Sequence, residues 1–263
     1  MTSHDDVDMP VALTDVDHWD SVWSNTHLPA EILKGRRAYV DAITDVFDRL
    51  LPREVSALEL GGAVGAWAVY LARRLGMRVS VLDYAPAGVE LTRRNFDLLG
   101  VPGEVTLGDM FTAEGGSFDL VYSLGVIEHF DDTRSAVAAH LRFVRPGGIV
   151  MVGCPNYGGI NRAIARYVSP TKLAEHNLEA MRVNDWPEMF ENQLGLEPIF
   201  RGYVGGFEPL MHKVAEGRRL DRRVVAASML VIGGALNLRV MRPLRTVNGG
   251  ALSNYCLGIY HAP

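Results

Sequence analysis

A glycine-rich turn follows the first apolar run of the chain. The run Val55–Leu60 (VSALEL) leads into Gly61-Gly62-Ala63-Val64-Gly65, and a helix-forming segment begins at Ala66. Glycine lets the backbone pass very close to a ligand, and the start of a helix offers free N–H groups to carboxylates or phosphates. The turn therefore indicates a site for a nucleotide-type ligand, although a tight turn without a ligand could have the same composition.

An acidic residue, Asp83, ends the next apolar run, Met77–Leu82. It follows Gly61 by about 20 residues, the length of one strand–helix–strand unit. A carboxylate at this place can accept hydrogen bonds from both hydroxyls of a ribose. Its alternative role is to cap the helix that we expect to begin at Pro86.

Polar residues also follow the third and fourth apolar runs. Asp109 could bond an adenine amino group while Met110 covers the ring, or it could be an ordinary turn residue. Glu128 and His129 come after the fourth run, and a neutral histidine can take a proton from a hydroxyl group. His129 is therefore a candidate base, or else it only orders its loop. Glu128 is expected to be structural.

Strand-like and helix-like segments alternate between residues 55 and 153. The expected strands are Val55–Leu60, Met77–Leu82, Glu104–Leu107, Phe118–Ser123 and Ile149–Gly153, with later strands at Pro198–Val204 and Asn254–His261, and the expected helices are Ala66–Leu75, Pro86–Leu99 and Asp131–Val144. This alternation predicts a mostly parallel sheet covered by helices on both faces. Ligands of such sheets bind at the carboxyl ends of the strands, where the candidate residues fall.

The N-terminal part of the chain is expected to be helical. Residues 1–18 are polar and are expected to be loosely ordered. Trp19, Val22 and Trp23 have the spacing of one helix face, and they could form a lid or pack as an ordinary amphipathic helix. A second helix is expected over Glu31–Leu51, where Pro52 ends it.

The C-terminal part has a looser pattern. Residues 156–190 could form a cap or substrate-side insertion, and a basic, apolar helix is expected around 218–242. Its apolar stretch, Val224–Leu236, is too short to span a bilayer. The arginines around it allow a membrane-surface helix, but a core helix is the favoured interpretation. These arginines lie at positions 222, 223, 239, 242 and 245.

Composition narrows the classes of protein to which the chain can belong. The chain has 263 residues, 48% of them hydrophobic, and a net charge of −5. This acidic balance argues against a general nucleic-acid binder. Two cysteines make neither a disulfide framework nor a metal cluster, and no metal site is expected at His176, because no third and fourth ligand falls at a suitable spacing. The acidic N-terminus is unlike a secretory signal, so a cytoplasmic protein is expected.

Five segments resemble an ordered set of family motifs: LELGGAVGAWAVYLA, VSVLDYA, LGDMF, FDLVYSLGVIEHF and VRPGGIVMV. Together they are similar to the motifs of class I S-adenosylmethionine-dependent methyltransferases, especially the small-molecule enzymes of quinone biosynthesis and natural-product tailoring. The resemblance implies an α/β, Rossmann-like fold with a mostly parallel seven-stranded sheet. It also implies an N-terminal helical lid at 1–54, a cofactor-binding core at 55–155, and a cap insertion with C-terminal strands at 156–263 that complete the same domain.

The resemblance also implies roles for single residues. The loop under the methionine moiety corresponds to Gly61, Gly62 and Gly65, anchored by Glu59. The ribose and adenosine contacts correspond to Asp83 and Tyr84, the adenine contacts to Asp109 and Met110, and the methionine end to Ser123 and Leu124. Apart from the resemblance, Trp23 is expected to contact the cofactor if its helix forms the lid. One departure is Ala63, which stands where the family usually has the middle glycine of the loop.

The implied activity is transfer of a methyl group from S-adenosyl-L-methionine, without a metal, to a small molecule, with S-adenosyl-L-homocysteine as product. A hydroxyl oxygen of a natural product, sugar or quinone-like compound is the expected acceptor; nitrogen and carbon acceptors, and a non-catalytic binding module, are the alternatives. A nicotinamide oxidoreductase is disfavoured, because Gly61, Ala63 and Ala66 keep only the first glycine of its fingerprint. The oligomeric state is not indicated.

Overall fold

The computed structural model describes residues 9–24, 26–214, 216–217, 219–236, 243 and 246–263. Within these ranges the elements are, in chain order, α1 (Val16–Trp23), α2 (Ala38–Leu50), β1 (Ser56–Leu60), α3 (Ala66–Leu75), β2 (Arg78–Asp83), α4 (Pro86–Leu99), β3 (Gly103–Leu107), β4 (Phe118–Leu124), η1 (Ile127–His129), α5 (Thr133–His140), β5 (Val144–Pro155), α6 (Gly159–Val168), α7 (Pro170–Ala174), η2 (Pro187–Asn192), β6 (Glu197–Val204), η3 (Pro209–His212), α8 (Leu220–Leu236) and β7 (Tyr255–His261).

The strands form one seven-stranded sheet in the order β3-β2-β1-β4-β5-β7-β6. The first five strands of this order are parallel, and β7 runs antiparallel to both β5 and β6. The strand order reverses between β1 and β4, which is the point where sheets of this kind bind ligands. The expected mostly parallel seven-stranded sheet is confirmed.

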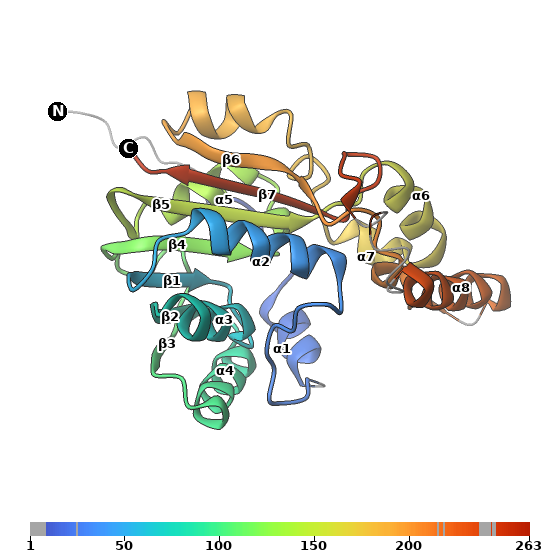
Figure 1. The fold of residues 1–263 in the computed structure, drawn as a ribbon, viewed down its shortest axis with the longest axis horizontal. Coiled ribbons are helices and arrows are strands. Elements are labelled where there is room, and N and C mark those ends of the chain that lie inside the picture. Colours follow the sequence, from blue (N-terminus) through green and yellow to red (C-terminus); the bar gives the residue numbers. More distant parts are fainter. Residues whose placement is uncertain (1–8, 25, 215, 218, 237–242, 244–245) are drawn as a thin grey trace.

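Helices cover both faces of the sheet because its central strands are apolar on both sides. One core includes Phe47 of α2, Leu71 of α3 and Phe96 of α4. The opposite core includes Val137 of α5 and Trp186. Figure 1 shows α2 and α3 in front of the strands and α5 behind them, while α1, α6, α7 and α8 lie beyond the carboxyl ends of the parallel strands.

Helix α2 is shorter than the sequence pattern predicted. It begins at Ala38 instead of Glu31. Gly35 has a left-handed φ of +86°, and its N–H donates to Asp41 Oδ1 over 2.6 Å. This turn before the helix stops the helical pattern from extending towards residue 31.

Helix α5 and strand β5 also differ from their predicted bounds. The helix covers Thr133–His140 and not Asp131–Val144, and Asp132 caps it by accepting from Ser135 N–H. Strand β5 covers Val144–Pro155, so it begins before the predicted strand Ile149–Gly153 and includes residues 146–148. The irregular register between β4 and β5 accommodates these residues without ending the strand.

The N-terminal segment from residue 9 is held in place, contrary to the expectation that residues 1–18 are loosely ordered. Leu13 N–H donates to the carbonyl of His129 over 2.8 Å, and Asp131 N–H donates to the carbonyl of Val11 over 3.1 Å. Ala12 and Phe130 form a β-bridge. Residues 1–8 lie outside the described part of the chain, so that part of the expectation is not addressed.

Helix α8 is not the core helix that its sequence favoured. Ala226 and Gly233 are its only buried residues among those described, whereas Val231 is 72% exposed. The helix extends beyond the end of the sheet (Figure 1) and packs on α6 and η3. Arg239, Arg242 and Arg245 lie outside the described residues. Among the helices described, none combines the length and apolar character needed to cross a membrane.

Candidate active site

The turn between β1 and α3 needs its glycines for close packing. Gly61 and Gly65 have left-handed φ angles of +63° and +74°. A Cβ on Gly61 would lie 2.6 Å from Val126 Cγ2, and one on Gly65 would lie 2.7 Å from Phe96 Cε1. The turn therefore packs against the segment after β4 on one side and against α4 on the other, and only glycine fits there without a shift.

Glu59 lies under this turn. A Cβ on Gly62 would lie 2.6 Å from Glu59 Cγ, so the glycine lets the backbone rest on the acidic side chain. The hydroxyl of Tyr122 donates to Glu59 Oε2 over 3.1 Å. Burial raises the pKa of Glu59 to about 8. Glu59 therefore supports the turn from below, and its role as an anchor of a cofactor loop stays a prediction.

Asp83 connects the glycine turn with the end of β2. Its Oδ2 accepts from Ala63 N–H over 3.1 Å, and its Oδ1 accepts from Ala85 N–H over 2.9 Å. The side chain is buried, and burial raises its pKa above the ordinary value. Each carboxylate oxygen can accept more than one hydrogen bond, so both oxygens keep capacity for ligand hydroxyls.

A cavity of about 230 Å³ opens at the carboxyl ends of β1, β2 and β4. Its walls combine several of the predicted cofactor residues with aromatic side chains of the N-terminal segment. The lining residues are Met9, Pro10, Ala12, Thr14, Trp19, Trp23, Gly61, Ala63, Leu82, Asp83, Tyr84, Gly108, Asp109, Met110, Phe111, Leu124, Gly125, Val126, His129 and Phe130. The cavity therefore lies where the strand order reverses.

The predicted adenosine contacts meet along one wall of this cavity. Tyr84, Asp109 and Met110 all line it. Asp109 Oδ1 accepts from Phe111 N–H over 2.8 Å, which forms a tight turn after β3. Burial raises the pKa of Tyr84 to about 12, so the phenol stays neutral. The proposed turn role of Asp109 and its possible ligand role are thus compatible.

Ser123 lies away from the cavity, although Leu124 lines it. Ser123 Oγ lies 2.9 Å from Nε2 of His140. The other ring nitrogen of His140, Nδ1, lies 3.0 Å from the carbonyl of Ala136. Because a carbonyl can only accept, Nδ1 carries the hydrogen and Ser123 donates to Nε2. Any contribution of the Ser123 side chain to ligand binding would therefore be indirect. Three other predicted cofactor residues, Glu59, Gly62 and Gly65, also do not line the cavity, so the same holds for them.

His129 presents one ring nitrogen that can accept a proton. Its Nδ1 lies 3.1 Å from the carbonyl of Glu175, so Nδ1 carries the hydrogen and Nε2 keeps its lone pair. Burial, together with the neighbouring His176, lowers the pKa of His129 to about 3. Trp19 contacts the imidazole edge-to-face at 4.9 Å between centroids. The ring is therefore neutral and held in one orientation at the cavity wall.

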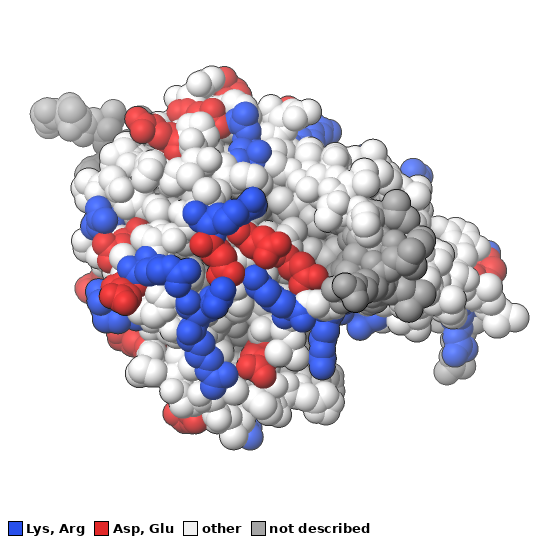
Figure 2. All heavy atoms as spheres, viewed as in Figure 1, with Lys and Arg blue, Asp and Glu red and all other residues white. Residues whose placement is uncertain are grey.

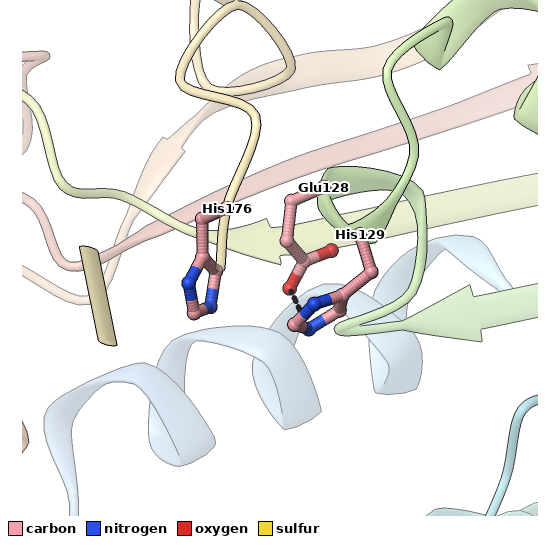
Figure 3. Close-up of side chains that lie close together, drawn as sticks. All are labelled: Glu128, His129 and His176. Carbon is pink, nitrogen blue, oxygen red and sulfur yellow. Dashed lines mark ion pairs between the residues drawn. The ribbon is translucent and has the colours of Figure 1, made fainter. Parts of the chain in front are cut away.

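Glu128 and His176 lie next to His129 (Figure 3). Glu128 Oε1 is 3.8 Å from His129 Nε2, and burial raises the pKa of Glu128 to about 8. The rings of His129 and His176 are 4.7 Å apart between centroids. Spacing along the chain offered no such cluster around His176, because the three residues come from two segments that the fold brings together.

Sequence reasoning missed the N-terminal wall of the cavity. Met9, Pro10, Ala12 and Thr14 line it, and Trp19 Nε1–H donates to Thr14 Oγ1 over 3.1 Å. A short apolar run, Val11–Leu13, was the available signal for this pairing. Asn156 and Tyr203 bond main-chain carbonyls: Asn156 donates to those of Gly250 and Ser253, and the hydroxyl of Tyr203 donates to that of Met181.

Solved methyltransferase structures have a similar fold. Coclaurine N-methyltransferase bound to N-methylheliamine and S-adenosylhomocysteine matches with a TM-score of 0.61 and 15% identity, over 96% of this chain and 84% of that one. Geranyl diphosphate C-methyltransferase from Streptomyces coelicolor A3(2) matches with a TM-score of 0.58 and 14% identity, over 96% of this chain and all (100%) of that one. At these identities the likeness defines the class of fold, a Rossmann-like class I methyltransferase.

Sequence comparison identifies the family. Residues 58–152 match the family described as a methyltransferase domain. The ubiquinone biosynthesis O-methyltransferase of Methylocella silvestris is 33% identical over 180 residues, which cover 59% of this chain and 68% of the relative. Two other curated relatives, also ubiquinone biosynthesis O-methyltransferases, are matched over about half of their length (52% and 53%). The chain belongs to the family of S-adenosylmethionine-dependent methyltransferases, and it is an enzyme that uses this cofactor.

Proposed function

We propose that the chain transfers the methyl group of S-adenosylmethionine to a hydroxyl oxygen of a small molecule. The observation that carries the proposal is the imidazole of His129 at the wall of the cavity, held as the tautomer in which Nε2 is unprotonated. The acceptor oxygen attacks the methyl carbon, the carbon–sulfur bond breaks, and its electron pair stays on sulfur as S-adenosylhomocysteine forms. The proton of the hydroxyl passes to Nε2, and alignment of oxygen, methyl and sulfur supplies most of the remaining rate.

The proposed cofactor position follows the walls of the cavity. In this arrangement the turn of Gly61, Gly62 and Gly65, with Glu59 below it, supports the methionine moiety, and Ser123 and Leu124 mark the methionine end. Asp83 holds the ribose, and Tyr84 packs beside the adenosine. Asp109 and Met110 contact the adenine, and Trp23 covers the cofactor. The stacked rings of Trp19 and Trp23, 5.9 Å apart between centroids, support the lid role.

The acidity of the acceptor matters, because His129 is a weak base. With a pKa of about 3, its imidazole takes a proton more readily from an acidic hydroxyl than from an aliphatic one. A phenol, whose pKa is about 10 in tyrosine, comes closer to this requirement than an aliphatic alcohol does. We therefore infer a phenolic acceptor, which also suits the aromatic walls formed by Trp19, Phe111 and Phe130.

Nucleic acid is not part of the proposal. On the face shown in Figure 2, basic and acidic side chains lie side by side and form no large basic area among the described residues. Lys34 bridges Asp45 and Asp48, and Arg74 also pairs with Asp48. A phosphate backbone favours a basic face. The cytoplasmic location expected from the sequence stays a prediction.

The acceptor atom can be tested with S-adenosylmethionine carrying a ¹³C-labelled methyl group. The protein is incubated with a panel of phenols, aliphatic alcohols and amines, and the ¹³C chemical shift of each product shows whether oxygen, nitrogen or carbon was methylated. We expect O-methylated phenols. Products methylated only on nitrogen or carbon would contradict the hydroxyl proposal and support the alternative acceptors.

The base can be tested with His129→Ala. We expect turnover to fall roughly 10²-fold, the scale of general base catalysis, while affinity for S-adenosylhomocysteine stays unchanged in calorimetry. His261→Ala is the matched control, because this histidine is exposed at the end of β7. A loss of turnover below about fivefold at every pH would reduce His129 to a loop-ordering residue.

A further inference from the structure

Glu128, His129 and His176 point their polar atoms towards one another (Figure 3). One ligand atom from each residue lies within 4.8 Å of the others. Glu128 is 1% exposed, and its Oε2 has no hydrogen-bond partner among the described residues. A buried carboxyl oxygen without a partner is costly, and a positively charged or donating ligand would remove this cost.

Both histidines have the hydrogen-bond pattern of metal ligands. His129 Nδ1 donates to the carbonyl of Glu175 over 3.1 Å, and His176 Nδ1 donates to the carbonyl of Lys172 over 2.6 Å. Each ring is therefore held as the tautomer that leaves Nε2 unprotonated. Metal-bound histidines usually donate their other N–H to a backbone carbonyl or a carboxylate, which fixes the tautomer and the ring orientation.

The two segments that carry the cluster are fastened to each other. Asn177 N–H donates to the carbonyl of Glu128 over 2.6 Å. Its side-chain amide donates to the carbonyls of Phe130 and Asp131 over 3.0 and 2.9 Å. These bonds hold His176 beside η1 without using any of the three ligand atoms. The cluster is thus built before a ligand arrives.

We propose that Glu128, His129 and His176 bind one divalent transition-metal ion such as Zn²⁺ or Co²⁺. Two imidazoles and one carboxylate form a donor set that these ions accept, and three protein ligands leave a coordination position open. Metal–ligand bonds of about 2.0–2.2 Å place neighbouring ligand atoms about 3–3.5 Å apart. The ligand atoms, which lie within 4.8 Å of one another, therefore need to converge by up to about 1.3–1.8 Å.

The site adjoins the proposed acceptor position, because His129 also lines the cavity. With the ion bound, Nε2 of His129 is a ligand and no longer a base. The charge of the ion would then lower the pKa of a hydroxyl bound in the open position. This role in the reaction rests on the proposed function, whereas metal binding itself does not.

Metal binding can be tested with Co²⁺, whose visible absorption reports its coordination. The chelator-treated protein is titrated with Co²⁺, and we expect the band to saturate at one ion per chain and to disappear when Zn²⁺ is added. His176→Ala and Glu128→Gln should each weaken binding at least tenfold. His176→Asp, which keeps a ligand atom, should retain saturable binding, and the exposed His261→Ala should behave like the unchanged protein.

Two outcomes would overturn the proposal. One is the lack of a saturable band in the unchanged protein, a result that does not depend on how any variant folds. The other is equal Co²⁺ affinity in the unchanged protein and in His176→Ala. Neither outcome bears on methyl transfer, which is measured separately, so failure of the metal site and failure of the proposed function can be told apart.

Discussion

At the scale of single residues, main-chain partners decide what the polar side chains of this site can do. The carbonyl of Glu175 takes the Nδ1 hydrogen of His129 and leaves Nε2 as an acceptor. Asp83 is fixed in a similar way by the N–H groups of Ala63 and Ala85. Both side chains are therefore oriented before a ligand binds, which lowers the entropy lost on binding.

If Asp83 bonds the ribose hydroxyls, changing Asp83 should reduce the preference of the protein for a ribose over a deoxyribose ligand. The unchanged protein should bind S-adenosylhomocysteine about 10- to 100-fold more tightly than its 2′-deoxyribose analogue, because a hydrogen bond to a charged group contributes about 1.5–3 kcal/mol. Asp83→Asn should reduce this ratio towards one in calorimetric titrations. A folded Asp83→Asn protein that kept the full ratio would exclude the ribose role, and Asp97→Asn, exposed on α4, is the control.

At the scale of elements, the turn from β1 to α3 is shaped by its neighbours as much as by its own residues. Val126 packs against Gly61, and Phe96 packs against Gly65. The turn is thus held between the segment after β4 and the helix α4. Close contact on both sides explains why small residues are needed in the turn. This requirement is separate from any need for the backbone to approach a ligand.

Two glycines with similar backbone angles allow this packing to be measured. Gly65 and Gly100 have φ angles of +74° and +61°, but a Cβ on Gly100 would meet no atom within 4 Å. Each change to alanine should cost about 1–2 kcal/mol for the left-handed conformation. Gly65→Ala should cost a further 1–3 kcal/mol or so, from overpacking against Phe96 and Thr92. Urea unfolding gives both values, and equal losses would contradict the packing argument.

At the scale of the whole molecule, the sheet buries an acidic residue in its centre. Glu59 of β1 pairs in register with Tyr122 of β4 and is 4% exposed. Burial raises its pKa to about 8, from an ordinary value of 4.5. Between these two values the unfolded chain carries the charged form and the folded chain the protonated form. Folding then takes up a proton, so this group makes the fold less stable as the pH rises.

The pH dependence of unfolding should therefore change in Glu59→Gln. Between about pH 5 and pH 8, the melting temperature of the unchanged protein should fall relative to that of Glu59→Gln, which has no charge to bury. The buried histidines, whose lowered pKa values act in the opposite direction, are the same in both proteins. Glu104→Gln is the control, because Glu104 is exposed on β3. Thermal unfolding at several pH values measures the effect, and parallel curves for the unchanged protein and Glu59→Gln would refute it.

The sequence by itself determined the alternation of strands and helices, the glycine turn and the position of Asp83 at the end of β2. These features are local: apolar periodicity and turn residues act over a few neighbours, and parallel strands bring their carboxyl ends to one edge of the sheet. Only the tertiary structure decided which distant segments meet. The pairing of residues 9–14 with the segment after β4, the placement of His176 beside Glu128 and His129, and the turn of Ser123 towards His140 depend on long-range contacts. No spacing along the chain encodes such contacts, because they form between surfaces that exist only once the sheet and its helices have packed.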